Sequence, residues 1–120
     1  MVRAVRAPPR LVYDGGCGFC RWCAEYADAR GVFELVEFDE LTPDQRARLP
    51  ADYANCVHLL TDDAVFSCGA AVEEVLARLG SPERTAVRLF RLLPDREPLR
   101  ESLYRTVADH RALFGRFRSR

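Results

Sequence analysis

The chain has 120 residues, enough for one compact domain with a real hydrophobic core but too few for two. Its formal net charge is zero and 48% of its residues are apolar, which is typical of a globular protein and excludes disordered and fibrous classes. No run approaches the roughly 18 consecutive apolar residues of a membrane-spanning helix. The basic residues 1–10 also lack the apolar stretch of a secretory signal. We therefore expect a cytoplasmic protein with no membrane span.

The first third of the chain predicts a strand, a turn and a helix. Residues 11–13 form an apolar run that indicates a short buried strand, and Asp-Gly-Gly at 14–16 indicates a turn. A helix is expected from Cys17 to Gly31. Apolar residues recur on one face of this helix: Phe19, Trp22, Cys23, Tyr26 and Ala27.

Next along the chain, residues 32–38 alternate well enough for a second strand. A short helix is expected after Thr42, because Thr42 is an N-cap residue followed by Pro43 and, three positions after the cap, by Gln45. Residues 56–60 are then expected to form a third strand.

The remaining elements are a return strand at residues 64–66 and three helices. The helices are expected over 71–79, over 81–94 and from about 99 to 114. The resulting order, β-α-β-α-β-β-α with additional C-terminal helices, is that of a thioredoxin-like α/β fold.

We expect a single thioredoxin-like domain over residues 1–120, with an N-terminal lead-in at 1–9 and a C-terminal helical extension at 83–120. All eighteen basic residues are arginines, and ten of them lie within the last forty residues. A basic segment is one feature of proteins that bind nucleic acid or an acidic partner. Here, however, apolar residues recur at helical spacing, and Phe114 and Phe117 are expected to dock the last helix. The sequence therefore predicts no nucleic-acid partner.

Five cysteines in a chain expected in a reducing compartment indicate redox or metal chemistry rather than a structural disulfide framework. Cys17 falls where a helix begins, and the unpaired N–H groups and positive dipole end of a helix stabilise an anion there. Cys20 lies one turn further on, near enough to attack a mixed disulfide formed at Cys17. We predict Cys17 as the nucleophile and Cys20 as the resolving thiol, with Arg21 as a source of positive potential.

The motif Asp14-Gly15-x-Cys17-x-x-Cys20, preceded by the apolar run at 11–13, resembles the signature of the DCC family of thiol–disulfide oxidoreductases. Weaker similarities to that family lie at Cys68-Gly69-Ala70-Ala71 and at Tyr104-x-x-Val107-Ala108-x-x-Arg111. The resemblance implies a thioredoxin-like fold and dithiol–disulfide activity. It carries over Cys17 and Cys20 as the redox pair and Asp14 as a motif residue.

Asp14 has two interpretations. Its carboxylate could carry a proton during the exchange, as a general acid or base. Alternatively it shapes the loop as an Asx-turn or helix cap, which is what an aspartate before two glycines favours. We keep Asp14 with Cys17 and Cys20 as the three candidate catalytic residues.

The chain also departs from thioredoxin itself. The dipeptide between the two cysteines, Gly18-Phe19, contains no proline. Thioredoxin-like domains usually have a cis-proline just before the third strand, where it contacts the substrate backbone, but residues 53–56 read Tyr-Ala-Asn-Cys. The sequence therefore gives no support to peptide binding in the thioredoxin manner.

A third cysteine extends the series Cys17, Cys20 and Cys23 into the spacing that ferredoxins use for clusters. The fourth cysteine of that pattern is replaced by Ala27, and at about 100° per residue Cys17 and Cys23 lie on different sides of the helix. Cys23 shares the apolar stripe with Trp22, so we expect it to be a small core residue.

The last two cysteines are placed by topology. In the expected fold, the start of the third strand and the end of the fourth lie near the end of the first, so Cys56 and Cys68 should lie near Cys17. This arrangement allows a second dithiol, a relay to the first pair or a thiolate metal site. Two buried apolar cysteines are an equal alternative. His58, inside an apolar strand, is expected to be a hydrogen-bonded core residue rather than a ligand.

The sequence thus predicts a thiol–disulfide oxidoreductase with no cofactor and no resident metal. Its expected partners are a disulfide-containing protein or small-thiol substrate and a cellular dithiol reductant, and the oligomeric state is not specified. One alternative is a metal- or cluster-binding protein that uses Cys17, Cys20 and either Cys56 or Cys68. Another is a redox-inactive interaction module whose basic C-terminal helices bind a partner.

Overall fold

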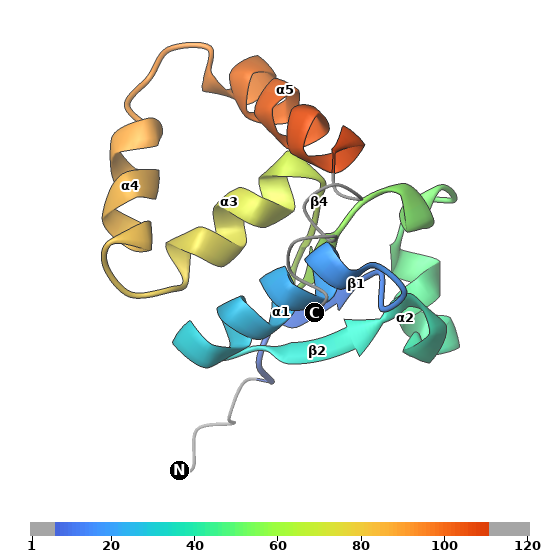
Figure 1. Cartoon of the computed structure of the whole chain (residues 1–120). Helices are drawn as coiled ribbons and strands as arrows, with labels where there is room; N and C mark the ends of the chain where they lie inside the picture. Colours follow the sequence, from blue (N-terminus) through green and yellow to red (C-terminus); the bar gives the residue numbers. More distant parts are fainter. Residues whose placement is uncertain (1–6, 111–120) are drawn as a thin grey trace, which may run out of the picture.

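The computed structural model describes residues 7–110, which form a mixed α/β structure (Figure 1). Its strands are β1 (Arg10–Tyr13), β2 (Glu34–Glu37), β3 (His58–Leu60) and β4 (Val65–Ser67). Its α-helices are α1 (Gly18–Arg30), α2 (Pro43–Arg48), α3 (Gly69–Ala77), α4 (Glu83–Phe90) and α5 (Arg96–Asp109). Short 3₁₀ turns occupy Phe38–Glu40 and Tyr53–Asn55.

The four strands form one sheet in the order β2-β1-β3-β4. β1 and β2 are parallel and are connected through α1, whereas β3 is antiparallel to both of its neighbours, β1 and β4. The predicted order β-α-β-α-β-β-α with additional helices is confirmed, and this mixed sheet is compatible with a thioredoxin-like fold.

Both faces of the central strands are covered. Leu11 and Val12 are adjacent on β1 and therefore point to opposite faces. Leu11 belongs to a cluster that includes Ala24 of α1 and Val75 of α3. Val12 belongs to a second cluster, with residues on either side of α2 such as Leu49. Hence α1 and α3 pack on one face of the sheet, and the α2 segment packs on the other (Figure 1).

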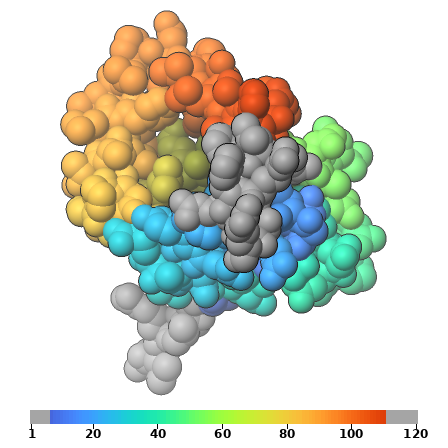
Figure 2. Space-filling model, viewed as in Figure 1, coloured from blue at the N-terminus to red at the C-terminus, as the bar shows by residue number. Residues whose placement is uncertain are grey.

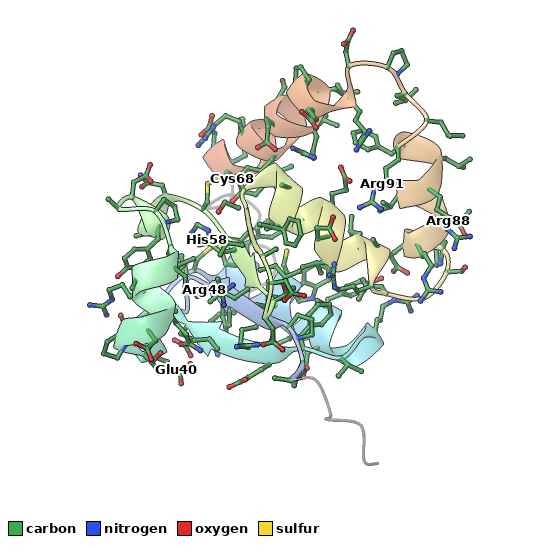
Figure 3. All side chains as sticks on the ribbon, turned by 180° about the vertical axis from the view of Figure 1, so that it is seen from behind. Glu40, Arg48, His58, Cys68, Arg88 and Arg91 are labelled. Carbon is green, nitrogen blue, oxygen red and sulfur yellow. A yellow bond between two sulfur atoms is a disulfide. The ribbon has the colours of Figure 1, made fainter. Side chains whose placement is uncertain are left out.

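The helix-start signals of α2 are confirmed. The Thr42 hydroxyl accepts the Gln45 N–H at 3.1 Å, and the Gln45 side chain accepts the Thr42 N–H at 3.0 Å. Near the end of α2, Arg48 donates to the backbone carbonyls of Thr61 and Ala64 at 2.6 and 3.1 Å, which ties α2 to the turn between β3 and β4 (Figure 3).

The expected third strand is two residues too long, because β3 begins at His58 and not at Cys56. The backbone N–H of Val57 donates to the Tyr104 hydroxyl of α5 at 3.1 Å instead of to a neighbouring strand. A side chain from a remote helix thus ends the ladder early. The last helix also begins earlier than expected, at Arg96, and ends at Asp109.

Beyond α3, the chain turns back so that α4 and α5 lie beside it (Figure 1). Residues 1–6 of the lead-in and 111–120 of the extension, with Phe114 and Phe117, lie outside the described residues. None of the helices between residues 7 and 110 combines the length and apolar character needed to cross a membrane.

A charged cluster attaches this helical extension to α3. Glu73 is 7% exposed, and its carboxylate accepts hydrogen bonds from Arg91 at 2.6 Å and from Arg100 at 3.1 Å. The Nε of Arg96 lies 3.8 Å from the same carboxylate. Arg91 lies between α4 and α3, whereas Arg88 projects from the outer side of α4 (Figure 3). Several arginines of the basic extension therefore serve an internal contact.

Candidate functional site

Cys17 is the N-cap residue of α1. The turn before it is closed by the Cys17 N–H, which donates to the Asp14 carbonyl at 3.3 Å. The Cys17 backbone is extended (φ −106°, ψ 117°), and its carbonyl accepts the first helical hydrogen bond, from Arg21 N–H at 2.9 Å. The side chain completes the cap, because Cys17 Sγ accepts the backbone N–H of Cys20 at 3.2 Å. The predicted start of the helix is therefore confirmed.

This position favours a negatively charged sulfur. The first turn of α1 contains no acidic residue, so its positive dipole end is not neutralised locally. An N–H group that donates to sulfur is a better partner for a thiolate than for a thiol, since an ionised acceptor makes the stronger bond. Cys17 and Cys20 are both thiols here and both are half-buried. The pair is therefore accessible in part at the start of the helix.

Asp14 shapes the loop that precedes the helix. One of its carboxylate oxygens accepts the Gly16 N–H at 2.9 Å, which is the Asx-turn expected of aspartate in this context. A Cβ atom at Gly15 would overlap the Glu37 carboxylate, so a side chain there would have to displace that of Glu37. These contacts fix the path of the turn from β1 into α1, and a role for Asp14 in proton transfer stays a prediction.

Tyr13 and Arg21 lie close to this turn. Partial burial raises the pKa of the Tyr13 hydroxyl, the carboxylates of Glu37 and Glu40 raise it further, and the charge of Arg21 acts in the opposite direction. Tyr13 is therefore a neutral hydroxyl at neutral pH. Arg21 is exposed, and its expected influence on Cys17 stays a prediction.

Cys56 and Cys68 form a disulfide. They are 12 residues apart in sequence, and their Cα atoms are 4.9 Å apart. Cys56 is buried just before β3, and Cys68 is half-buried at the N-cap of α3 (Figure 3). Cys68 has a φ of 57°, in the left-handed region that non-glycine residues rarely adopt. The alternative of two separate buried cysteines is therefore wrong, and the expected proximity of this pair to Cys17 stays a prediction.

Helix α5 contacts the backbone beside both of these cysteines. The residue after Cys56 donates its N–H to Tyr104, as described above, and the residue after Cys68 donates its N–H to a carboxylate oxygen of Glu101 at 3.1 Å. That second residue is Gly69, where a Cβ atom would lie 2.7–2.9 Å from the Glu101 carboxylate. The sequence indicated no role for Glu101, and Tyr104 stood out only as part of the family motif. Their three-residue spacing on one helix face was the available signal.

A cavity of about 600 Å³ adjoins both cysteine pairs. Cys20 and Cys56 both line it, together with Tyr13 and Asp14 at the end of β1. The surface is hollowed between α1 and the α4–α5 region, with α3 at the back (Figure 2). The lining is largely apolar, contributed by the facing sides of α1, α3 and α5.

The expected core role of Cys23 is wrong. Cys23 is exposed, and the fully buried positions of α1 are Ala24 and Ala27. The large residues of the predicted stripe face the cavity instead: Trp22 stacks on Tyr26 with ring centroids 5.6 Å apart, and these two side chains are 36% and 40% exposed. Small residues of α1 contact the sheet because they allow a close approach between helix and strand.

His58 is a satisfied core residue, as expected. Its Nε2 lies 2.8 Å from the Tyr53 carbonyl, which can only accept, so Nε2 carries the proton. Its Nδ1 then accepts from the Ser67 hydroxyl at 2.8 Å. Burial lowers the pKa of the His58 ring although the bond to Tyr53 and the charge of Asp52 act in the other direction. His58 is therefore a neutral imidazole with both ring nitrogens hydrogen-bonded, and its role is structural.

No three histidine, cysteine or acidic side chains gather closely enough to hold a metal ion within residues 7–110. The alternative set of Cys17, Cys20 and either Cys56 or Cys68 also loses its third thiolate while the Cys56–Cys68 disulfide is formed.

Comparison with known protein families adds one finding to this geometry. A family model described as DCC1-like thiol-disulfide oxidoreductase matches residues 11–117, nearly the whole chain. No curated protein and no solved structure matches the chain.

Proposed function

This chain belongs to the DCC1-like thiol-disulfide oxidoreductase family, and on that premise we propose that it performs thiol–disulfide exchange with Cys17 as the nucleophile and Cys20 as the resolving thiol. The observation that carries the proposal is the 3.2 Å hydrogen bond from the Cys20 N–H to Cys17 Sγ at the N-terminus of α1. A sulfur held there is stabilised as a thiolate by the helix dipole and by a direct donor, and the thiolate is the reactive form.

The exchange proceeds in two displacements. The Cys17 thiolate attacks one sulfur of a substrate disulfide, the substrate S–S bond breaks, and the leaving sulfur takes up a proton. Cys20 then loses its proton and attacks Cys17 Sγ, which releases the second substrate thiol and leaves a Cys17–Cys20 disulfide. Two electrons pass to the substrate, and a cellular dithiol reductant returns two electrons to the enzyme. The direction of net flow is set by the reduction potentials of the three couples.

Asp14 is the candidate carrier of the proton that Cys20 loses. It lines the same cavity as Cys20, and one of its oxygens is held by the Gly16 N–H. A carboxylate fixed in this way presents its other oxygen at a constant place, which general acid–base chemistry requires.

The substrate is a disulfide-containing protein or a small disulfide. Val57 occupies the place before β3, and its N–H is already bonded to Tyr104. A peptide substrate therefore finds no vacant main-chain donor at that residue, and the apolar walls of the cavity favour recognition through side chains.

The test is to trap the intermediate. Cys20→Ser keeps the nucleophile and removes the resolving thiol, so incubation with glutathione disulfide should leave glutathione attached at Cys17, detected by peptide mass spectrometry. Cys17→Ser is the matched control and should leave Cys20 unmodified under the same conditions. Modification of Cys23 instead of Cys17 in Cys20→Ser, or of Cys20 in Cys17→Ser, would contradict the assignment of the nucleophile.

A further inference from the structure

We propose that the Cys56–Cys68 disulfide is a second redox centre, which exchanges electrons with the Cys17–Cys20 pair inside one molecule. This inference rests on the proposed function, because it needs Cys17 to act as a nucleophile. It assigns chemistry to two cysteines that lie outside the CxxC motif.

Strand register brings the two centres together. In the antiparallel pairing of β1 with β3, Val12 lies opposite His58. The pairing ends there, but Asp14 follows Val12 by two residues and Cys56 precedes His58 by two, so both continue from the same end of the paired strands, and Cys17 follows Asp14 through a tight turn. The shared cavity supports this placement, since Cys20 and Cys56 both line it.

The geometry also selects the sulfur that is attacked. Cys56 lines the cavity that Cys20 lines, whereas Cys68 lies at the N-cap of α3. Cys17 Sγ accepts the N–H of Cys20, so an attack from the side of the cavity that Cys20 lines meets Cys56 Sγ, and Cys68 Sγ leaves.

In the folded protein, contacts other than the disulfide also hold its two segments together. The segments that it joins are already paired through the β3–β4 hairpin, and the Cys68 N–H donates to the Val57 carbonyl at 2.9 Å. The contacts from Tyr104 and Glu101 of α5 hold the same two segments. A disulfide stabilises a protein mainly by restricting the unfolded chain, and the effect grows with the length of the closed loop, which is short here because the two cysteines are 12 residues apart. A bond whose two ends are held independently can break and re-form without loss of the fold.

The transfer is balanced within the chain. The Cys17 thiolate forms a bond to Cys56 Sγ as the Cys56–Cys68 bond breaks, and Cys68 takes up a proton. Cys20 loses a proton and attacks Cys17 Sγ, which releases Cys56 as a thiolate that is protonated in turn. The products are a Cys17–Cys20 disulfide and a Cys56/Cys68 dithiol. Two electrons have moved within the chain, Cys20 supplies one proton, and water returns the proton that Cys17 lost when it ionised.

A pair of double variants tests the contact between the centres. Cys20→Ser with Cys68→Ser leaves Cys17, Cys23 and Cys56, and glutathione disulfide should convert Cys17 and Cys56 to an internal link that peptide mass spectrometry detects after alkylation. Cys20→Ser with Cys56→Ser is the matched control, in which a Cys17–Cys68 link should form at least about tenfold more slowly. Glutathione retained on Cys17 in both variants, with no internal link, overturns the relay but leaves the proposed function standing. A Cys17 that takes up no glutathione in either variant overturns both.

A second experiment uses the unmodified chain, so its result does not depend on whether a variant folds. The protein with both disulfides formed receives one equivalent of a dithiol reductant, and samples are alkylated in acid over time and mapped. The relay predicts that electrons become shared between the two pairs at a first-order rate that a tenfold dilution leaves unchanged. Reduction confined to Cys17 and Cys20, with Cys56–Cys68 intact throughout, overturns it.

Discussion

Cys17 and Cys20 lie on a single turn of one helix, whereas Cys56 and Cys68 meet only after a hairpin, a helix start and the distant helix α5 have taken their places. The first pair depends on local structure: a turn, an N-cap and one backbone N–H. The second pair depends on tertiary structure. Substitutions in the C-terminal helices should therefore affect the Cys56–Cys68 pair and leave the Cys17–Cys20 pair unchanged.

The largest expected effect separates the two pairs by chemistry. Cys17→Ser should lower the rate of exchange with glutathione disulfide by at least about a hundredfold, because a hydroxyl is not ionised where a thiol is. The rate is measured by the release of reduced glutathione. The double change Cys56→Ser with Cys68→Ser is the comparison, and it should leave the rate within about threefold. Equal losses of exchange rate in both proteins would contradict the assignment of substrate exchange to the Cys17–Cys20 pair.

The next effect concerns the attachment of the extension. Glu73→Ala should lower the free energy of unfolding by about 2 kcal/mol, since it leaves the guanidinium groups of Arg91 and Arg100 without their shared carboxylate; the figure is reduced because those groups are partly solvated. Urea unfolding measures it. Glu74→Ala, which removes a more exposed carboxylate beside Glu73, is the matched control and should cost less.

That cluster also gives a pH dependence. Burial alone would raise the pKa of Glu73, but hydrogen bonds and charge from Arg91 and Arg100 outweigh it, and the pKa is lowered from 4.5. A lowered carboxyl pKa contributes stability that is present above 4.5 and is lost as the pH falls through the folded value. The free energy of unfolding should thus decline below pH 4.5, and Glu73→Gln should flatten that decline. An unchanged slope would rule out this carboxylate as its source.

A smaller effect tests the contact at β3. Tyr104→Phe removes the acceptor of the Val57 N–H and should cost about 1 kcal/mol of unfolding free energy. Amide hydrogen exchange at Val57 should accelerate, and the Cys56–Cys68 disulfide should become easier to reduce. Tyr26→Phe, which removes a hydroxyl that donates to Glu83 elsewhere, serves as the control and should leave Val57 exchange unchanged.

The smallest effect concerns His58, a buried residue of β3 that follows Cys56 by two positions. Burial lowers the pKa of His58 from 6.5, so the folded state resists protonation of its ring. The unfolding free energy should be fully retained above pH 6.5 and should fall as the pH drops from there towards the folded pKa. His58→Gln should remove this part of the pH dependence. A stability that rises on acidification through that window would contradict the neutral ring.

Local features of this chain were predictable from sequence and remote ones were not. The cap at Thr42 and the helix start at Cys17 are decided by residues within three or four positions, so the sequence alone specifies them. The early end of the β3 ladder is decided by Tyr104, 47 residues from Val57, and no local pattern reports it. The same holds for the arginines around Glu73.

The error at Trp22 and Cys23 has a different origin. The apolar periodicity of α1 was real, but it describes a helix with two apolar contacts: small alanines against the sheet and large side chains at the cavity. A hydrophobic stripe does not distinguish a core from a cavity wall. Topology was the more reliable guide for Cys56 and Cys68, because the hairpin fixes where its ends meet.

The charged cluster on α3 implies an unequal tolerance to mutation. Three arginines surround one carboxylate, so the loss of any one arginine leaves two to neutralise Glu73. Loss of the carboxylate removes the one partner that all three arginines share, and leaves Arg91 with Glu74 and Arg100 with Glu101. Among variants selected only for folding, substitutions should therefore accumulate at Arg91, Arg96 and Arg100 one at a time, whereas Glu73 should change rarely. Random mutagenesis with a folding reporter should recover fewer substitutions at Glu73 than at any of the three arginines.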